Sequence, residues 1–452
     1  MNGFINQKIM PPMLKFLNTK AVTAIKNGML YPIPFIIIGA IFLILSNFPY
    51  TPIADWITKV GWSPIFNQAY GASFGIMSLF ACFGIAYSWV KGEGHEPASA
   101  GLVAIVTFVL LQPSSITQVT NVLDPTKTST AWEATGAFNA AWFGGKGMIL
   151  AIICGLLVGW SYSWFIKKNI TIKLPEQVPA NVAASFSALV PGFIITFVAM
   201  LIYALTTLTS HQTPIEWVYK VIQTPLQHVS DGPVGVLIVA FLPVFIWWFG
   251  VHGATVIGAI MSPLLLANNA DNLYLYQHHA LKLGATLDGH SAHIVTQAFM
   301  DQFITVTGSG LTFGFVIFMI YRAKSVQMKT IGRLTIIPSL FNINEPVLFG
   351  MPVVLNPVLA TPFILAPLIS GFATYFAIFF HIIKPFNGLY VPWTTPPLIS
   401  GLIVGGWGGL IWQAIMIVVT GLLYWPFARK YDQILVEQEK EAYEAEQAAA
   451  EA

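Results

Sequence analysis

One carboxylate stands alone in a long apolar part of the chain and is the strongest candidate for chemistry. Glu345 is the only charged residue between Arg333 and Lys384. A carboxylate in such a segment costs several kcal/mol unless it faces protein or water, so by default it marks a functional site. Pro346 disfavours a helix at Glu345, and broken backbone at membrane depth is tolerated only inside protein or beside a wet cavity. We therefore expect a polar cavity in which Glu345 accepts a hydrogen bond or a proton.

A second isolated polar residue is His252. No formally charged residue lies between Asp231 and Asp271. Glycines on either side of His252 allow a ligand to approach closely, and Trp247 just upstream offers a flat face for a sugar ring. A lone histidine is more often structural, but the isolation that it shares with Glu345 favours a common polar site.

Two loops supply further candidates for binding a sugar. Asn139 precedes a Gly-Gly-Lys-Gly turn at the start of an apolar stretch and could bind a hydroxyl group. This turn lacks the spacing of a phosphate-binding P-loop. Trp393 lies in a Pro-Trp-Thr-Thr-Pro loop and could close a pocket by stacking, although a tryptophan at the membrane interface is the equal alternative.

The remaining chemistry-bearing residues indicate no metal or redox site. His290 and His293 are three residues apart, but a metal needs three or four ligands, and neither a His-Glu-x-x-His motif nor a cysteine partner is present. We expect a solvated outer loop there and no cofactor. Cys82 and Cys154 both lie in apolar stretches and are expected to be buried, not to carry phosphate.

The elements that must position these residues cross a membrane. Of the 452 residues, 56% are hydrophobic and 9% are charged, whereas soluble domains carry about 25% charged residues. The net charge of +2 is too small to suggest a nucleic-acid partner. The composition predicts an all-α polytopic membrane protein.

Ten apolar stretches are candidate spans, judged against the length of about 20 residues that a bilayer requires. The last two are overlong and rich in glycine and proline, so each could contain a kink or a re-entrant hairpin. The stretches are 29–48, 71–90, 98–112, 148–166, 184–209, 234–250, 255–267, 304–321, 353–381 and 397–427.

Charge sets the expected orientation and domain division. Ten crossings from a cytoplasmic N-terminus put the densest clusters of lysine and arginine in the cytoplasm, as the positive-inside rule requires, with both termini inside. An amphipathic interfacial segment after residue 210 separates two groups of five spans. We expect a first half over 1–210, a second half over 211–430 and an acidic cytoplasmic tail over 431–452.

The motifs together resemble those of a known family. Asn-Glu-Pro flanked by Phe-Asn-Ile and Val-Leu-Phe-Gly, with Trp-x-Phe-Gly-Val-His-Gly upstream, is similar to the IIC permeases of the bacterial phosphotransferase system. The lactose, cellobiose and diacetylchitobiose branch is the most similar, over about residues 5–430. The resemblance implies about ten spans with re-entrant hairpins, a homodimer interface in the first half, and a sugar site in a mobile second half.

The resemblance also implies roles for individual residues. Glu345 would contact the C6 hydroxyl of a disaccharide, with His252 in the same pocket, and these two would be the catalytic residues. Asn139, Trp247, Trp393 and Asn344 would also bind the sugar. The phosphate would come from a cysteine of a separate, phosphorylated IIB protein, because this chain carries no fused IIA or IIB domain. The protein would reside in the bacterial plasma membrane.

Alternatives of other classes remain open from the sequence. An ion-coupled disaccharide carrier would use Glu345 to bind a proton, without any phosphorylation. A membrane-embedded hydrolase would use Glu345 with His290 and His293, although the metal motif is missing. A receptor or structural protein would leave two isolated polar sites unused. The sequence does not distinguish the disaccharides, nor an inward-facing from an outward-facing cavity.

Overall fold

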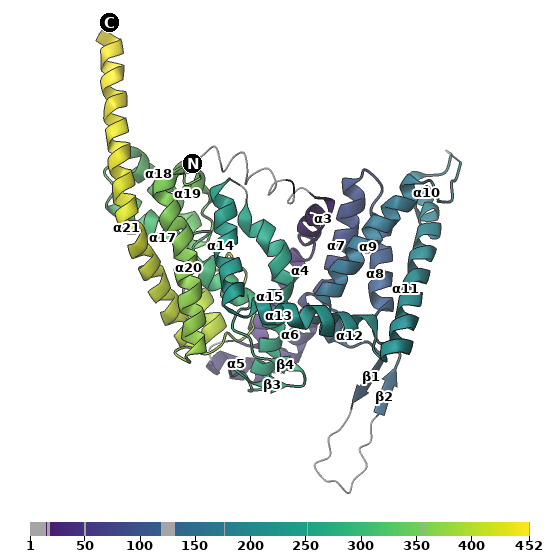
Figure 1. Ribbon diagram of the computed structural model, residues 1–452. Helices are drawn as coiled ribbons and strands as arrows, with labels where there is room; N and C mark the ends of the chain where they lie inside the picture. Colours follow the sequence, from purple (N-terminus) through teal and green to yellow (C-terminus); the bar gives the residue numbers. More distant parts are fainter. Residues whose placement is uncertain are drawn as a thin grey trace. The chain divides into compact units, whose positions relative to one another are not determined.

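The computed structural model (Figure 1) describes residues 15, 19–48, 51–118, 132–175, 177–250, 252–354 and 356–451. The chain is 73% helical. In the described residues, sheet is limited to two antiparallel ribbons. One pairs β1 (Ser115–Gln118) with β2 (Trp132–Thr135), and the other pairs β3 (Thr286–Leu287) with β4 (His290–Ser291).

Within the described residues, seven helical segments are long and apolar enough to span a membrane, and one bent pair adds an eighth. The pair joins Pro214–Ser230 to Pro233–Trp248 at 75°. The expected all-α membrane fold is confirmed, while several of the ten expected spans are shorter or broken. The seven segments are Lys20–Ser46, Trp62–Gly92, Gly145–Lys167, Val182–Ser210, Gly253–Gln277, Pro357–Phe379 and Ile399–Ala445.

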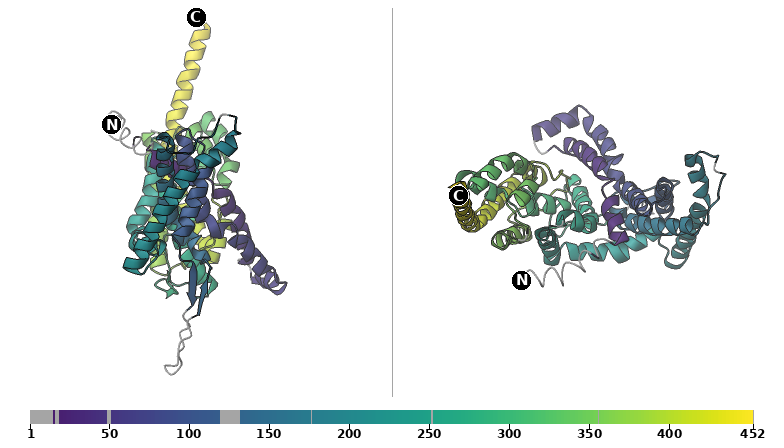
Figure 2. Two further views of the ribbon diagram at one scale, coloured as in Figure 1. Left: turned by 90° about the vertical axis from the view of Figure 1, so that its right-hand side faces the viewer. Right: turned by 90° about the horizontal axis from the view of Figure 1, so that it is seen from above.

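The chain forms two compact units, of which the first comprises residues 1–42 and 64–227. Its helices α7, α8, α9 and α11 lie side by side (Figures 1 and 2). Cys82 and Cys154 are buried in their shared core, as expected. Its elements are α3 (Lys20–Gly28), η2 (Phe74–Ile76), α7 (Met77–Gly92), α8 (Ala98–Leu110), η3 (Ala140–Trp142), η4 (Gly145–Gly147), α9 (Met148–Lys167), α10 (Ala180–Ser187), α11 (Leu189–Ser210), α12 (Pro214–Val218), η5 (Tyr219–Gln223) and most of α4 (Ile33–Ser46) and α6 (Trp62–Gly71).

The second unit comprises residues 43–63 and 228–452. Helix α14 packs against α15 and α20, and α17 packs against α18 and α21. Its elements are α5 (Thr51–Lys59), the last three residues of α13 (Thr224–Ser230), α14 (Pro233–Trp248), α15 (Gly253–Gln277), α16 (Gln297–Phe299), η6 (Met300–Ile304), α17 (Phe313–Tyr321), α18 (Val326–Leu340), α19 (Glu345–Gly350), α20 (Pro357–Phe379) and α21 (Ile399–Glu451).

The first compact unit ends at Gln227 and so includes the amphipathic segment that follows residue 210. The amphipathic segment packs on the first unit, because the Gln223 amide donates to the carbonyl of Gly145 at 3.4 Å and the Tyr219 ring meets Trp142 edge to face. The roles expected for the two halves, dimerisation and sugar transport, stay predictions.

Two expected spans contain non-helical backbone. In the stretch 304–321 the helix starts only at Phe313, because positive φ angles at Thr307, Gly308, Gly310 and Leu311 break the preceding turns. This part of the expectation was wrong.

The stretch 397–427 does contain a sharp break, as anticipated. Gly406 has φ 60° and ψ −154°, so residues 399–405 fold back as a short hairpin arm. A Cβ on Gly401 would lie 2.9 Å from the carbonyl of Gly409, so glycine permits the two arms to touch. Gln413 ties the arms together by accepting the N–H of Gly401 at 3.1 Å.

Candidate functional site

Glu345 is the first residue of the short helix α19, after non-helical backbone at residues 341–344. The expectation that no helix would form at Glu345 was wrong. Pro346 occupies the first turn of α19, where a backbone N–H has no helical partner and the fixed φ of proline suits the helix. The break therefore lies immediately before the carboxylate, whose side chain remains 42% exposed.

His252 lies opposite this carboxylate. Its Nε2 is 3.6 Å from Oε1 of Glu345, and its side chain is 48% exposed. His252 also caps the start of α15, where Nδ1 accepts the backbone N–H of Thr255 at 3.2 Å and lies 2.7 Å from the Thr255 hydroxyl. Because Nδ1 is an acceptor, the proton of the neutral imidazole is on Nε2, which points toward Glu345. The structure therefore places the two isolated polar residues next to each other, and their part in sugar binding stays a prediction.

Trp247 packs behind His252 instead of presenting an open face. The two ring centroids are 4.8 Å apart, and Phe349 meets the indole edge to face at 5.8 Å. Trp247 is only 3% exposed. Its Nε1 is buried, and no acceptor reaches it within the described part of the chain. A buried indole N–H without a partner is costly, so this atom is a candidate donor to a ligand.

Asn344 is buried and its amide is engaged by protein. The Nδ2 atom donates to the carbonyl of Ser309 at 2.7 Å and to the Thr312 hydroxyl at 2.9 Å. Its side chain also fills the space that a Cβ on Gly308 would take. These contacts favour a positioning role for Asn344 over the direct sugar contact that we expected.

Asn342 connects the backbone before Glu345 to two other segments. Its Oδ1 accepts the N–H of Thr307 at 2.6 Å. Its Nδ2 donates to the carbonyls of Trp393 and Thr395. The structure thereby brings the loop that carries Trp393, which is 46% exposed, next to the loop that carries Glu345. Sequence reasoning missed Asn342, since only its place in the Asn-x-Asn-Glu run pointed to it.

Asn139 lies in the first unit, whereas the other candidate residues lie in the second. It caps η3 by accepting the N–H of Ala141 at 2.9 Å, and its side chain is exposed. Its part in sugar binding stays a prediction.

The histidines after α15 form a buried ion network, so the expected solvated loop was wrong for His293. His293 is 5% exposed. Its Nδ1 lies 3.0 Å from Asp231 and its Nε2 lies 3.3 Å from Asp271. His290 lies 2.7 Å from the other oxygen of Asp271. Among the described residues no group of three ligands could hold a metal ion. The network fastens the loop, because Asp231 also accepts the backbone N–H groups of Ile294 and Val295 at 2.7 Å.

Burial alone would lower the pKa of His293, but Asp231 and Asp271 outweigh it and raise the pKa to about 9. Since the unfolded value is about 6.5, the stabilisation is complete below pH 6.5 and is lost as the pH rises through 9. It is on the order of 3 kcal/mol. We expect the melting temperature of the purified protein to fall between pH 7 and 10, and His293→Gln to melt lower at pH 6 with a flatter profile. Equal pH profiles of the two proteins would contradict this role.

The chain matches the family model "Phosphotransferase system, EIIC" over residues 26–367. It is 33% identical to the lichenan permease IIC component of Bacillus subtilis (strain 168), covering 97% of this chain and 95% of the relative. It is 32% identical to the cellobiose-specific EIIC component of Geobacillus stearothermophilus, covering 95% and 94%.

A solved structure agrees with these relatives over nearly the whole chain. The crystal structure of ChbC, the IIC component of an N,N'-diacetylchitobiose-specific phosphotransferase system, superposes with a TM-score of 0.89 at 33% identity. It covers 97% of this chain and 99% of that one. These matches agree with the membrane helices of the structure and with the broken backbone before the half-exposed Glu345. The chain belongs to the EIIC family of the phosphotransferase system and is a sugar-translocating IIC subunit in a membrane.

Proposed function

We propose that this IIC subunit imports a disaccharide of the cellobiose, diacetylchitobiose or lactose type, so that its C6 hydroxyl can be phosphorylated by a separate phosphorylated IIB protein. The observation that carries the proposal is the pair formed by Glu345 and His252. Both side chains are nearly half exposed and lie 3.6 Å apart, with broken backbone beside them. The relatives named for cellobiose, lichenan and diacetylchitobiose support the choice of substrate class.

The carboxylate of Glu345 accepts the C6 hydroxyl in this proposal. A hydrogen bond to an ionised acceptor is shorter and stronger than a neutral one. His252 donates from Nε2 to the other side of the carboxylate, which fixes its orientation. When the C6 oxygen attacks the phosphorus of the IIB phosphocysteine, the S–P bond breaks and the thiolate leaves on IIB. Glu345 takes the hydroxyl proton as general base.

The aromatic residues play different parts. Trp393 is exposed enough to stack on a sugar ring, as aromatic faces do. Trp247 is buried, so it supports His252 and offers its free indole N–H as a donor. Asn344 positions the backbone through Ser309 and Thr312. Asn139, whose side chain is exposed on the first unit, is a further candidate for binding a sugar hydroxyl.

The assembly and orientation are part of the same proposal. The protein is a homodimer in a bacterial plasma membrane, with both termini in the cytoplasm. Arg322 and Lys324 follow α17, and the backbone N–H of Lys324 donates to Asp432 next to Arg429 and Lys430. These basic residues therefore gather at one end of the second unit, which the positive-inside rule assigns to the cytoplasm.

The substrate class is tested by direct binding to the purified protein. We expect cellobiose or diacetylchitobiose to raise the melting temperature, and maltose to leave it unchanged. Phosphorylation is then measured in liposomes with phosphorylated IIB. Uptake that needs no phosphorylated IIB and dissipates a proton gradient would replace this function with an ion-coupled carrier.

His252→Ala should lower sugar transport in cells by about 10- to 100-fold. It removes the imidazole whose Nε2 lies 3.6 Å from the Glu345 carboxylate. In the proposed sugar complex this contact shortens to a hydrogen bond to a charged group, which is worth about 1.5–3 kcal/mol. The matched control is His278→Ala, at the end of α15 away from Glu345. A normal rate for His252→Ala at normal expression would leave His252 with only its structural role as the cap of α15.

A further inference from the structure

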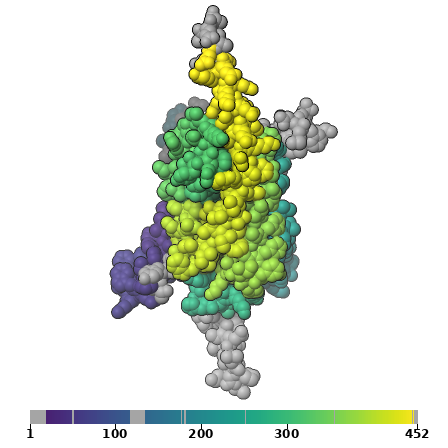
Figure 3. All heavy atoms as spheres, turned by 90° about the vertical axis from the view of Figure 1, so that its left-hand side faces the viewer, coloured from purple at the N-terminus to yellow at the C-terminus, as the bar shows by residue number. Residues whose placement is uncertain are grey.

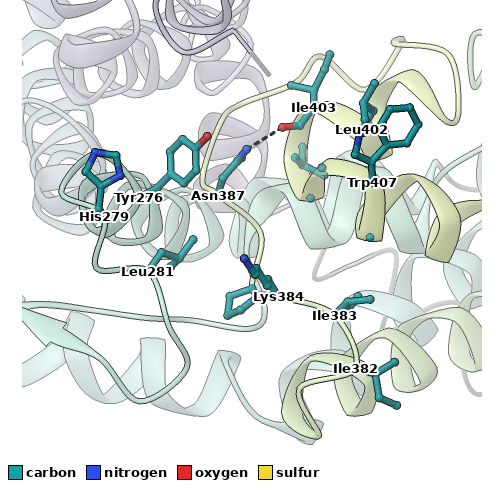
Figure 4. Close-up of a pocket in the computed structure, with 15 residues that line it drawn as sticks. Tyr276, His279, Leu281, Ile382, Ile383, Lys384, Asn387, Leu402, Ile403 and Trp407 are labelled. Carbon is teal, nitrogen blue, oxygen red and sulfur yellow. Dashed lines mark hydrogen bonds between the residues drawn. The ribbon is translucent and has the colours of Figure 1, made fainter. Parts of the chain in front are cut away.

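The second unit contains a cavity of about 610 Å³ that is separate from the proposed sugar site. It lies between the C-terminal end of α15, the segment after α20, and the tip of the α21 hairpin (Figure 4). Neither Glu345 nor His252 lines it. The sugar site therefore does not account for it.

The lining of this cavity favours an anion. Lys384 is the only lysine or arginine among its lining residues, and no aspartate or glutamate is present. Lys384 is exposed, and no ion pair to it occurs within the described residues. Tyr276, His279 and Asn387 supply further polar groups (Figure 4), of which the Asn387 amide already donates to the carbonyl of Ile403 at 2.7 Å.

One wall of the cavity begins an apolar stripe on α21. Trp407 lines the cavity, and the exposed side chains that follow recur every three or four residues on one helix face. Figure 3, seen from the left-hand side of Figure 1, shows α21 (yellow) at the surface of the second unit. The stripe members are between 39% and 73% exposed, and they are Trp407, Ile411, Ile415, Val418, Leu422 and Trp425.

The length of this stripe matches the membrane interior. Trp407 and Trp425 are 18 positions apart, about 27 Å at 1.5 Å per residue, and a hydrocarbon core is about 30 Å thick. Tryptophans are enriched at both membrane interfaces. The stripe is therefore suited to acyl chains, and Trp407 and the cavity with Lys384 lie at headgroup level.

The basic end of the second unit lies at the opposite end of the stripe. Arg322 lies 5.9 Å from the ring centroid of Trp425, and Arg429 and Lys430 follow in the same helix. By the positive-inside rule this end faces the cytoplasm. The cavity is then at the outer leaflet.

We propose that the cavity binds the phosphate group of an anionic phospholipid of the outer leaflet, with Lys384 as its cation and the acyl chains along the α21 stripe. A soluble phosphate could make the same contact between a phosphate anion and Lys384. The cavity is continuous with the apolar stripe at Trp407, and the exposed Ile382 adds a second apolar side chain to its lining, which together favour the lipid.

The test titrates the full-length protein with phosphatidylglycerol or phosphatidylcholine and counts retained lipids by native mass spectrometry. We expect one phosphatidylglycerol to be retained in preference to phosphatidylcholine. Lys384→Ala should bind it about fivefold more weakly, and Lys384→Arg should retain it. The matched control is Lys282→Ala, a nearby exposed lysine that does not line the cavity.

Three results would overturn the proposal. They are unchanged phosphatidylglycerol retention in Lys384→Ala, an equal loss in Lys282→Ala, and displacement of the lipid by millimolar inorganic phosphate or glycerol phosphate. The last result would identify a soluble anion as the ligand. Because the readout requires neither sugar nor IIB, it is independent of the proposed transport function.

Discussion

Glu345→Gln is expected to lower sugar phosphorylation by about 100-fold or more while sugar binding weakens much less. A general base contributes about 10²- to 10⁴-fold to a rate, and an amide cannot take the hydroxyl proton. The amide oxygen can still accept the N–H of His252, because the Nδ1 bond to Thr255 fixes the proton on Nε2. The amide nitrogen then faces the sugar and can donate to its C6 oxygen. Because a neutral hydrogen bond replaces one to a charged group, binding should fall by only about 1 kcal/mol, or roughly fivefold.

The measurement separates these two effects. Wild-type and variant protein in liposomes receive phosphorylated IIB and labelled cellobiose, and calorimetry gives the binding constant of each. Glu345→Asp keeps the charge, while Glu441→Gln removes an exposed carboxylate from the C-terminal part of α21 as a matched control. A wild-type phosphorylation rate in Glu345→Gln would exclude the general base, and unchanged binding as well would remove Glu345 from the site.

The proximity of Glu345 and His252 could be predicted from the sequence, because isolation of a polar group in an apolar segment is a local property. The burial cost of a carboxylate or an imidazole requires a compensating environment wherever the chain folds. Glu345 and His252, 93 positions apart in the chain, therefore pointed to a common site. Their separation of 3.6 Å agrees with that reasoning.

The supporting residues could not be predicted in the same way. Asn342 and Asn344 are equivalent in sequence context, and both look suited to bind a sugar. Their bonds go to backbone and hydroxyl groups of distant segments, which no local pattern reveals. His293 was expected to be solvated because its loop is polar in sequence, yet the structure buries it. Its burial is possible because it pairs with Asp231 and Asp271, which come from distant parts of the chain and could not be matched to it by a local pattern.

The expected start of a span at residue 304 failed for a related physical reason. Thr307 and Leu311 are compatible with a helix by composition, yet both adopt positive φ. Bonds such as that from the N–H of Thr307 to Asn342 stabilise this strained backbone. Irregular backbone buried in protein is the arrangement tolerated at membrane depth.

Asn342→Ala should therefore reduce sugar affinity, although the Asn342 side chain contacts protein groups and not the sugar. The substitution leaves the N–H of Thr307 and the carbonyls of Trp393 and Thr395 without their partner. Asn342 is only 5% exposed, so water does not readily replace these bonds. At about 1 kcal/mol for each bond, the site loses on the order of 3 kcal/mol. We expect sugar affinity to fall by about 10- to 100-fold, because Trp393 and Glu345 are no longer held together.

General destabilisation is separated from this effect by a second buried asparagine. Asn268 is fully buried, and its amide donates to the carbonyl of Val295 at 2.8 Å. Asn268→Ala should also lower the melting temperature but leave the affinity of the folded protein unchanged. Melting temperatures are measured by differential scanning fluorimetry at one common heating rate. Sugar affinity is then measured by calorimetry at about 20 °C below the lower of the two melting temperatures, where both variants are folded. Equal losses of affinity in the two variants would mean that Asn342 acts only through stability, and that the loops carrying Glu345 and Trp393 are positioned by other contacts.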